Sequence, residues 1–143
     1  MKAKAFTVRR ADWAADGPGL RAVREAVFLR EQGVPADLEW DGLDPECAHA
    51  LALDARGEAI GTARLTPDGH IGRMAVLAPW RGHGVGTALL EAMLAEARRR
   101  GFARVALNAQ LTAGGFYRRS GFAPEGDEFL DAGIPHIRMT LVL

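Results

Sequence analysis

The clearest regularity in the chain is a stretch in which apolar residues recur every three or four positions. This spacing predicts an amphipathic helix over residues 85–100, because one face of such a helix meets the core and the other meets water. Three arginines end the stretch and Gly101 follows it, which suits the C-terminal end of a helix. The predicted buried face consists of Val85, Leu89, Leu90, Met93, Leu94 and Ala97.

Two further helices are predicted from shorter patterns. Residues 17–33 have apolar positions at helical spacing, with a proline near the start and a glycine after the end. Residues 112–121 predict a short helix, with Thr112 as its N-cap and Gly121 at its end. The polar, acidic segment 34–47 is interpreted as a loop with one short helical turn.

Strand-like segments fill most of the remaining chain. The three strands between residues 49 and 77 are joined by short polar turns and predict an antiparallel meander. The strand, helix and strand between residues 70 and 109 predict a crossover unit, which joins parallel strands. The pattern therefore predicts an α/β (α+β) fold with a mixed sheet and helices packed on it. The predicted strands are 5–10, 49–54, 59–66, 70–77, 103–109 and 135–143.

Composition narrows the class of protein. The 143 residues fit one domain over 1–143, and 48% of them are hydrophobic, as in a globular protein. Because 18 Lys and Arg balance 18 Asp and Glu, charge gives no case for a nucleic-acid or membrane partner. The single cysteine, Cys47, excludes an intrachain disulfide, and no histidine pair has metal-ligand spacing, so no metal is expected. The start of the chain lacks a signal-like apolar run, which predicts a cytoplasmic protein.

The segment RGHGVGT, residues 81–87, places three glycines where the long helix should begin. A helix N-terminus has about four backbone N–H groups without intrahelical partners and a positive dipole end. Glycines let an anion approach those groups closely, and Arg81 adds a full positive charge. The segment therefore suits a pyrophosphate, although the glycines could also serve only to pack the helix close to the sheet.

Two better-known phosphate loops do not fit. A Walker A loop requires a lysine that this segment lacks. A dinucleotide fingerprint requires a third glycine at position 87 or 89, and those positions are Thr87 and Leu89.

The stretch VLAPWRGHGVGTALLEAMLAEARRRG resembles the acetyl-CoA motif of the GNAT superfamily of N-acetyltransferases. The pattern Gln/Arg-x-x-Gly-x-Gly/Ala is matched by Arg81, Gly84 and Gly86. RMAV, LNAQ and FYRRSGFAP also match in the family's order and spacing, so the resemblance covers essentially the whole chain. The segment VFLREQGVPADLEWDGLDPECAHAL, together with GIPHIRM, is similar to the ElaA-like branch. The resemblance implies a mostly antiparallel sheet, flanked by helices, with one splayed strand pair.

The resemblance also implies a cofactor, acetyl-CoA, and the residues that bind it. Backbone groups of Met74, Ala75 and Val76 would bind the pantetheine arm, and Asn108 would bind its amide. Phe116 and Tyr117 would flank the thioester. Backbone N–H groups of the loop would bind the pyrophosphate, and this loop comprises Arg81, Gly82, His83, Gly84, Val85, Gly86 and Thr87.

Tyr117 is the only tyrosine in the chain and, through the resemblance, the expected general acid. A phenol has a pKa near 10 and a thiol near 8.5, so the phenol can protonate the departing thiolate. The alternative is a tyrosine that only packs. The base that deprotonates the acceptor amine is left open between His136, Glu31 and a chain of water molecules.

The leading hypothesis is an N-acetyltransferase that moves an acetyl group from acetyl-CoA to a primary amine of a small molecule or peptide. The acidic segment ADLEWDGLD, residues 36–44, would favour a cationic acceptor if it lined the cleft. The alternatives are a non-catalytic acyl-CoA sensor and an interaction domain with a purely structural glycine loop. Because superfamily members are often dimers, the resemblance also allows a homodimer.

Overall fold

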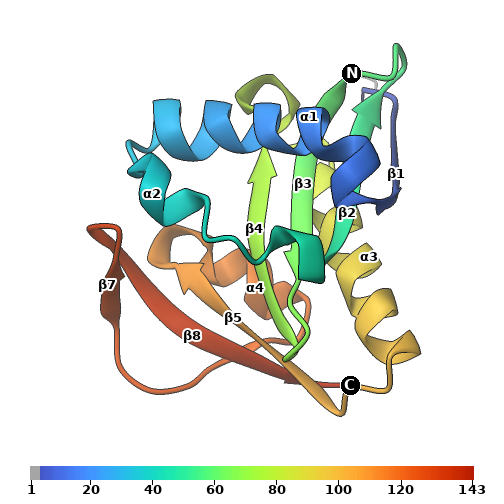
Figure 1. Ribbon diagram of the computed structural model, residues 1–143. Helices are drawn as coiled ribbons and strands as arrows, with labels where there is room; N and C mark the ends of the chain where they lie inside the picture. The colour runs from blue at the N-terminus through green and yellow to red at the C-terminus, as the bar shows by residue number, and fades with distance from the viewer. Residues whose placement is uncertain (1–3) are drawn as a thin grey trace.

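The computed structural model describes residues 4–143. Over this range eight strands form one sheet in the order β1-β2-β3-β4-β5-β8-β6, and β7 pairs with β8 (Figure 1). Every pairing is antiparallel except that of β4 with β5, which confirms the predicted mixed, mostly antiparallel sheet. The strands are β1 Phe6–Ala11, β2 Ala48–Asp54, β3 Ala59–Leu65, β4 His70–Val76, β5 Arg104–Gln110, β6 Ala123–Pro124, β7 Phe129–Asp131 and β8 Ile134–Val142.

Helices cover both faces of the sheet. In Figure 1, α1 crosses the near face of β3 and β4, while α3 packs on β2 and β3. The longer helical segments are α1 Trp13–Arg24, its π-helical continuation η1 Glu25–Glu31, α2 Ala36–Glu39, α3 Val85–Arg99 and α4 Gly114–Arg119. Three short 3₁₀ turns complete the set: η2 Asp44–Glu46, η3 Ala78–Trp80 and η4 Leu111–Ala113.

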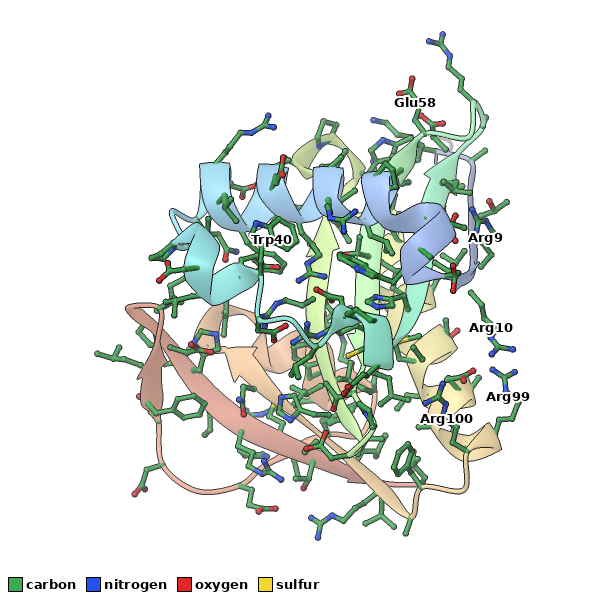
Figure 2. The ribbon with its side chains drawn as sticks, viewed as in Figure 1. Arg9, Arg10, Trp40, Glu58, Arg99 and Arg100 are labelled. Carbon is green, nitrogen blue, oxygen red and sulfur yellow. The ribbon has the colours of Figure 1, made fainter. Side chains whose placement is uncertain are left out.

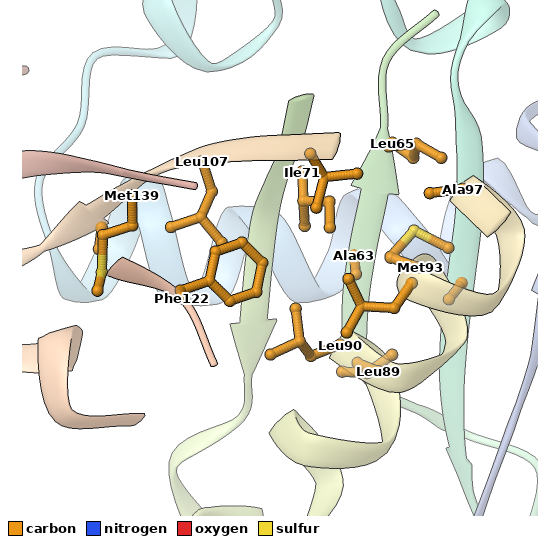
Figure 3. Packing of buried hydrophobic residues seen from close by; sticks show 14 of the residues in the cluster. Ala63, Leu65, Ile71, Leu89, Leu90, Met93, Ala97, Leu107, Phe122 and Met139 are labelled. Atoms are coloured by element: carbon orange, nitrogen blue, oxygen red, sulfur yellow. The ribbon is translucent and has the colours of Figure 1, made fainter. Parts of the chain in front are cut away.

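The largest core cluster lies between α3 and the sheet. All six residues of the predicted apolar face are buried, with exposed fractions of 6% or less. Figure 3 shows Leu89, Leu90 and Met93 packed against the strands. Burying one such side chain stabilises the fold by about 1.5–3 kcal/mol, so this face fixes α3, and with it the glycine loop, on the sheet.

The first helix begins earlier than predicted. It starts at Trp13, because the Asp12 side chain accepts a hydrogen bond from the backbone N–H of Ala15 at 2.9 Å and caps the helix. Pro18 therefore lies inside α1 rather than at its start. The predicted helix end holds, since the helical path continues through η1 to Glu31, with Gly33 following at a positive φ.

In the C-terminal part, one local prediction was wrong and two short strands were not predicted. Thr112 does not cap α4, because the chain enters this helix through η4, and the N-cap position is Ala113 with no side-chain hydrogen bond. The strands β6 and β7 were not predicted. All three residues of β7 are exposed, so this strand shows no alternation of buried and exposed positions, and it forms because the turn at Ala132 and Gly133 folds it back on β8.

Candidate active site

A gap opens between β4 and β5. The two strands pair only at His70 with Ala106 and at Ile71 with Leu107, and no further residues of the two strands pair beyond that point. The register of β3 against β4 shifts here, so that Arg73 and Met74 together lie opposite one residue of β3. Such a β-bulge bends the strand and ends regular pairing. The predicted splayed strand pair is thereby confirmed.

A cavity of about 160 Å³ occupies the gap, and Tyr117 of α4 lies in its wall. The phenol hydroxyl donates to Met74 Sδ at 3.7 Å, and the ring packs edge-on against Phe116 and Phe122. Burial raises the pKa of Tyr117 to about 12, because the charged phenolate would lose its hydration. Tyr117 is therefore a neutral hydroxyl donor at physiological pH. Asn108 of β5 lines the same cavity.

The glycine loop lies at the N-terminus of α3, beside a groove of about 430 Å³. Gly84 is the N-cap with φ +87°, and a Cβ built on it would meet no atom within 4 Å. Gly86 differs, because its Cβ would lie 3.4 Å from Phe116 Cζ. Gly84 thus serves the turn and leaves an open approach to the helix N-terminus, while a Cβ at Gly86 would make an ordinary van der Waals contact with Phe116.

Arg81 is held by Glu31. Both terminal nitrogens of its guanidinium donate to the Glu31 carboxylate at 2.7 Å, and Nε donates to the Val76 carbonyl at 3.0 Å. The hydrogen bonds from Arg81 lower the pKa of Glu31. Glu31 lines neither the Tyr117 cavity nor the neighbouring cavity at His136. Both facts make Glu31 a poor candidate for the base.

The second cavity, of about 230 Å³, adjoins the first. His136 of β8 lines it, and Nδ1 lies 2.6 Å from the Ile134 carbonyl. Because a carbonyl only accepts, Nδ1 carries the proton, which leaves Nε2 of the neutral ring able to accept one. The residues that line both cavities are Phe28, Gln32, Arg73 and Gln110.

The comparisons with known proteins identify the family. Residues 22–143 match the family described as Acetyltransferase (GNAT) domain. The chain belongs to the GNAT family. It is therefore an acyltransferase, and the family implies an acyl-CoA co-substrate and an amine-bearing acceptor.

Individual GNAT relatives agree with this result. The uncharacterized N-acetyltransferase YjcF of Bacillus subtilis is 40% identical over 121 residues, which span 82% of this chain and 86% of YjcF. Escherichia coli ElaA has a TM-score of 0.83 at 28% identity, covering 95% of this chain and 99% of ElaA. An acyl-CoA N-acyltransferase of Pseudomonas aeruginosa has the same TM-score and coverage at 30% identity. The predicted ElaA-like resemblance is confirmed.

Three of the four carboxylates in the acidic segment 36–44 pair with arginines, and the fourth, Asp37, is exposed. Glu39 and Asp44 ion-pair with Arg24 at 2.7 Å, and Asp41 pairs with Arg64 at 2.5 Å. Trp40 lies beneath α1 (Figure 2) and packs on the Arg24 guanidinium. Glu39 and Asp41 line the second cavity, so the segment does line the candidate cleft, but arginines already pair with both carboxylates. These ion pairs tie the segment to the sheet and to α1.

The arginines at the end of α3 also have a structural use. Arg10, Arg99 and Arg100 lie near one another (Figure 2), and all three ion-pair with the buried Glu96. Arg99 and Arg100 are thus exposed at the end of α3 while they neutralise a buried carboxylate.

Three residues of the site were missed from the sequence. Arg73, Gln32 and Gln110 lie in segments that carry the family resemblance, but none of the three was assigned a role from the sequence. In the structure the Gln110 side-chain amide donates to Gln32 Oε1 at 2.9 Å, between η1 and β5. These contacts join residues far apart in the chain, so no local signal could have revealed them. No helix in residues 4–143 is long and apolar enough to cross a membrane.

Proposed function

We propose that the protein transfers an acetyl group from acetyl-CoA to a primary amine of a small molecule or peptide. The observation that supports this is a gap between β4 and β5 with a neutral phenol in its wall and a second cavity adjoining it. The gap can take an extended thioester-bearing arm, and the second cavity can take the amine. The GNAT family already implies an acyl-CoA and an amine, so the proposal concerns the acetyl group and the class of acceptor.

In this proposal the cofactor follows the exposed edge of β4. The backbone groups of Met74, Ala75 and Val76, which have no partner on β5, bind the pantetheine arm. Asn108 binds its amide from the opposite strand, and Phe116 flanks the thioester end. The backbone N–H groups of residues 81–87 bind the pyrophosphate at the positive end of α3.

The chemistry needs three proton transfers. An alkyl ammonium with a pKa of about 10 first loses one proton to His136 Nε2 or to water. The amine nitrogen bonds to the thioester carbon, an oxyanion forms, and the C–S bond then breaks to release CoA. Tyr117 gives its proton to the departing sulfur, the nitrogen gives up its second proton to restore the Tyr117 phenol, and a backbone N–H of Met74 or Val76 stabilises the oxyanion.

The remaining predictions about context belong to the same proposal. A cytoplasmic location fits a reducing compartment for Cys47. A single domain over residues 1–143 and a homodimer stay predictions.

Calorimetric titration with acetyl-CoA tests the proposal. We expect a Kd in the micromolar range, corresponding to about −8 kcal/mol, and weaker binding of CoA lacking its 3′-phosphate. A screen of amino acids, polyamines and peptide N-termini, read as thiol release, should then give acetyl transfer. Absence of binding at high acetyl-CoA concentration would refute the choice of acetyl-CoA. Binding without transfer to any amine would refute the class of acceptor.

A further inference from the structure

Arg73 has an unusual backbone conformation for its residue type. Its φ is +50°, in the left-handed region, which costs a residue with a Cβ about 1–2 kcal/mol. It lies at the bulge of β4, and its carbonyl accepts a hydrogen bond from the Thr62 hydroxyl at 2.9 Å. Such a conformation persists only where the surroundings hold it in place.

The side chain of Arg73 supplies a second hold. Its Nη2 donates to the carbonyls of Leu38 and Glu39 at 3.3 and 3.1 Å, and to Asp41 Oδ2 at 3.2 Å. Its Nε lies 3.2 Å from Glu39 Oε2, a carboxylate that is only 4% exposed. One side chain thus ties the bulge of β4 to the α2 segment.

The location of Arg73 gives this tie a consequence for the site. Arg73 lines both the Tyr117 cavity and the His136 cavity. The sulfur of the next residue, Met74, accepts the hydrogen bond from the Tyr117 hydroxyl. A change in the backbone at Arg73 would therefore move the thioester strand, the acid and the wall that faces the acceptor together.

We propose that Arg73 is a positioning residue for acyl transfer. Its ion pairs with Glu39 and Asp41 maintain the bulge that separates β4 from β5 and place Met74 against Tyr117. Arg73 itself touches no reacting atom in this role. The inference rests on the proposed function for its catalytic meaning, but the positioning of Met74 and Tyr117 can be tested without any cofactor.

A matched control separates positioning from general stability. Arg64 belongs to the same ionic cluster, pairs with Asp41 and Asp44, and has a side chain only 6% exposed. It lines neither cavity. Loss of either arginine removes one of the two arginines that pair with each carboxylate it contacts, and so lowers stability. Only loss of Arg73 should change the site.

The experiment compares Arg73→Gln, Arg73→Gly, Arg73→Lys and the control Arg64→Gln. The first readout is the pKa of Tyr117, which is measured by phenolate absorbance. This signal is specific because the chain has one tyrosine. The second is the Kd of acetyl-CoA by calorimetry. We expect Arg73→Gln to lower the pKa of Tyr117 and to weaken acetyl-CoA binding about tenfold. Arg64→Gln should melt earlier but retain both wild-type values.

The other variants make the result decisive. Glycine adopts a positive φ freely, so Arg73→Gly keeps the backbone conformation but loses the ion pairs, and it should behave like Arg73→Gln. Wild-type values in Arg73→Gly would overturn the ionic link, and equal readouts for Arg73→Gln and Arg64→Gln would overturn the positioning role. Arg73→Lys keeps the charge, and both its pKa of Tyr117 and its Kd for acetyl-CoA should lie between those of the wild type and Arg73→Gln. If the wild type failed to bind acetyl-CoA, the proposed function would fail, while the pKa of Tyr117 would still decide this inference.

Discussion

The hydroxyl of Tyr117 permits a direct test of how burial prepares this site. A tyrosine in water has a pKa near 10, whereas burial raises the pKa of Tyr117 to about 12. Burial causes this shift, because the phenolate would lose its hydration. The general acid should therefore stay protonated, and able to protonate a thiolate, across the range in which enzymes are assayed.

The stability of the fold should follow the same shift. Because the folded pKa lies above the unfolded one, the folded state holds this proton more tightly. The contribution is complete below about pH 10 and is lost as the pH rises toward about 12. A difference of about 2 in pKa corresponds to about 3 kcal/mol. Relative to Tyr117→Phe, the wild type should lose about this much of its free energy of unfolding over that range.

The assay is a pH titration of the folded protein in which phenolate absorbance is measured. The Tyr117→Phe variant gives the background absorbance of the tryptophans. In denaturant the same tyrosine should titrate near 10. We expect Tyr117→Phe to bind acetyl-CoA like the wild type and to lose about 100-fold or more in turnover. A folded-state pKa near 10 would refute the burial argument, and unchanged turnover would refute the role of the acid.

Three further predictions concern the cofactor loop and the base. Gly84→Asp should weaken acetyl-CoA binding measured by calorimetry, because the new carboxylate repels phosphate and a side chain is strained at φ +87°. The control Gly57→Asp, at φ +81° and away from the loop, should lose similar stability but keep the wild-type affinity. Glu31→Gln should strengthen acetyl-CoA binding severalfold by freeing Arg81, and weaker binding would contradict the competition between carboxylate and phosphate. His136→Ala should lower turnover without changing the affinity for acetyl-CoA, and unchanged turnover would assign the amine proton to water.

The spacing of apolar residues was sufficient to predict elements that bury one regular face. The six apolar positions of α3 repeat every three or four residues because one face of that helix packs on the sheet. The glycine loop could also be predicted from the sequence, since a turn with φ +87° at Gly84 favours glycine whatever surrounds it. These local constraints, together with the crossover unit, determined the fold class from the sequence alone.

Only the tertiary structure decided how charge is distributed in the site. The acidic segment read as a surface that attracts cations, yet folding brings Arg24, Arg64 and Arg73 onto its carboxylates. Glu31, a candidate base in the sequence, became the partner of Arg81, 50 residues away. The cause is the same in each case. Ion pairs, cavities and bulges depend on distances between segments remote in sequence, and those distances exist only once the sheet has formed.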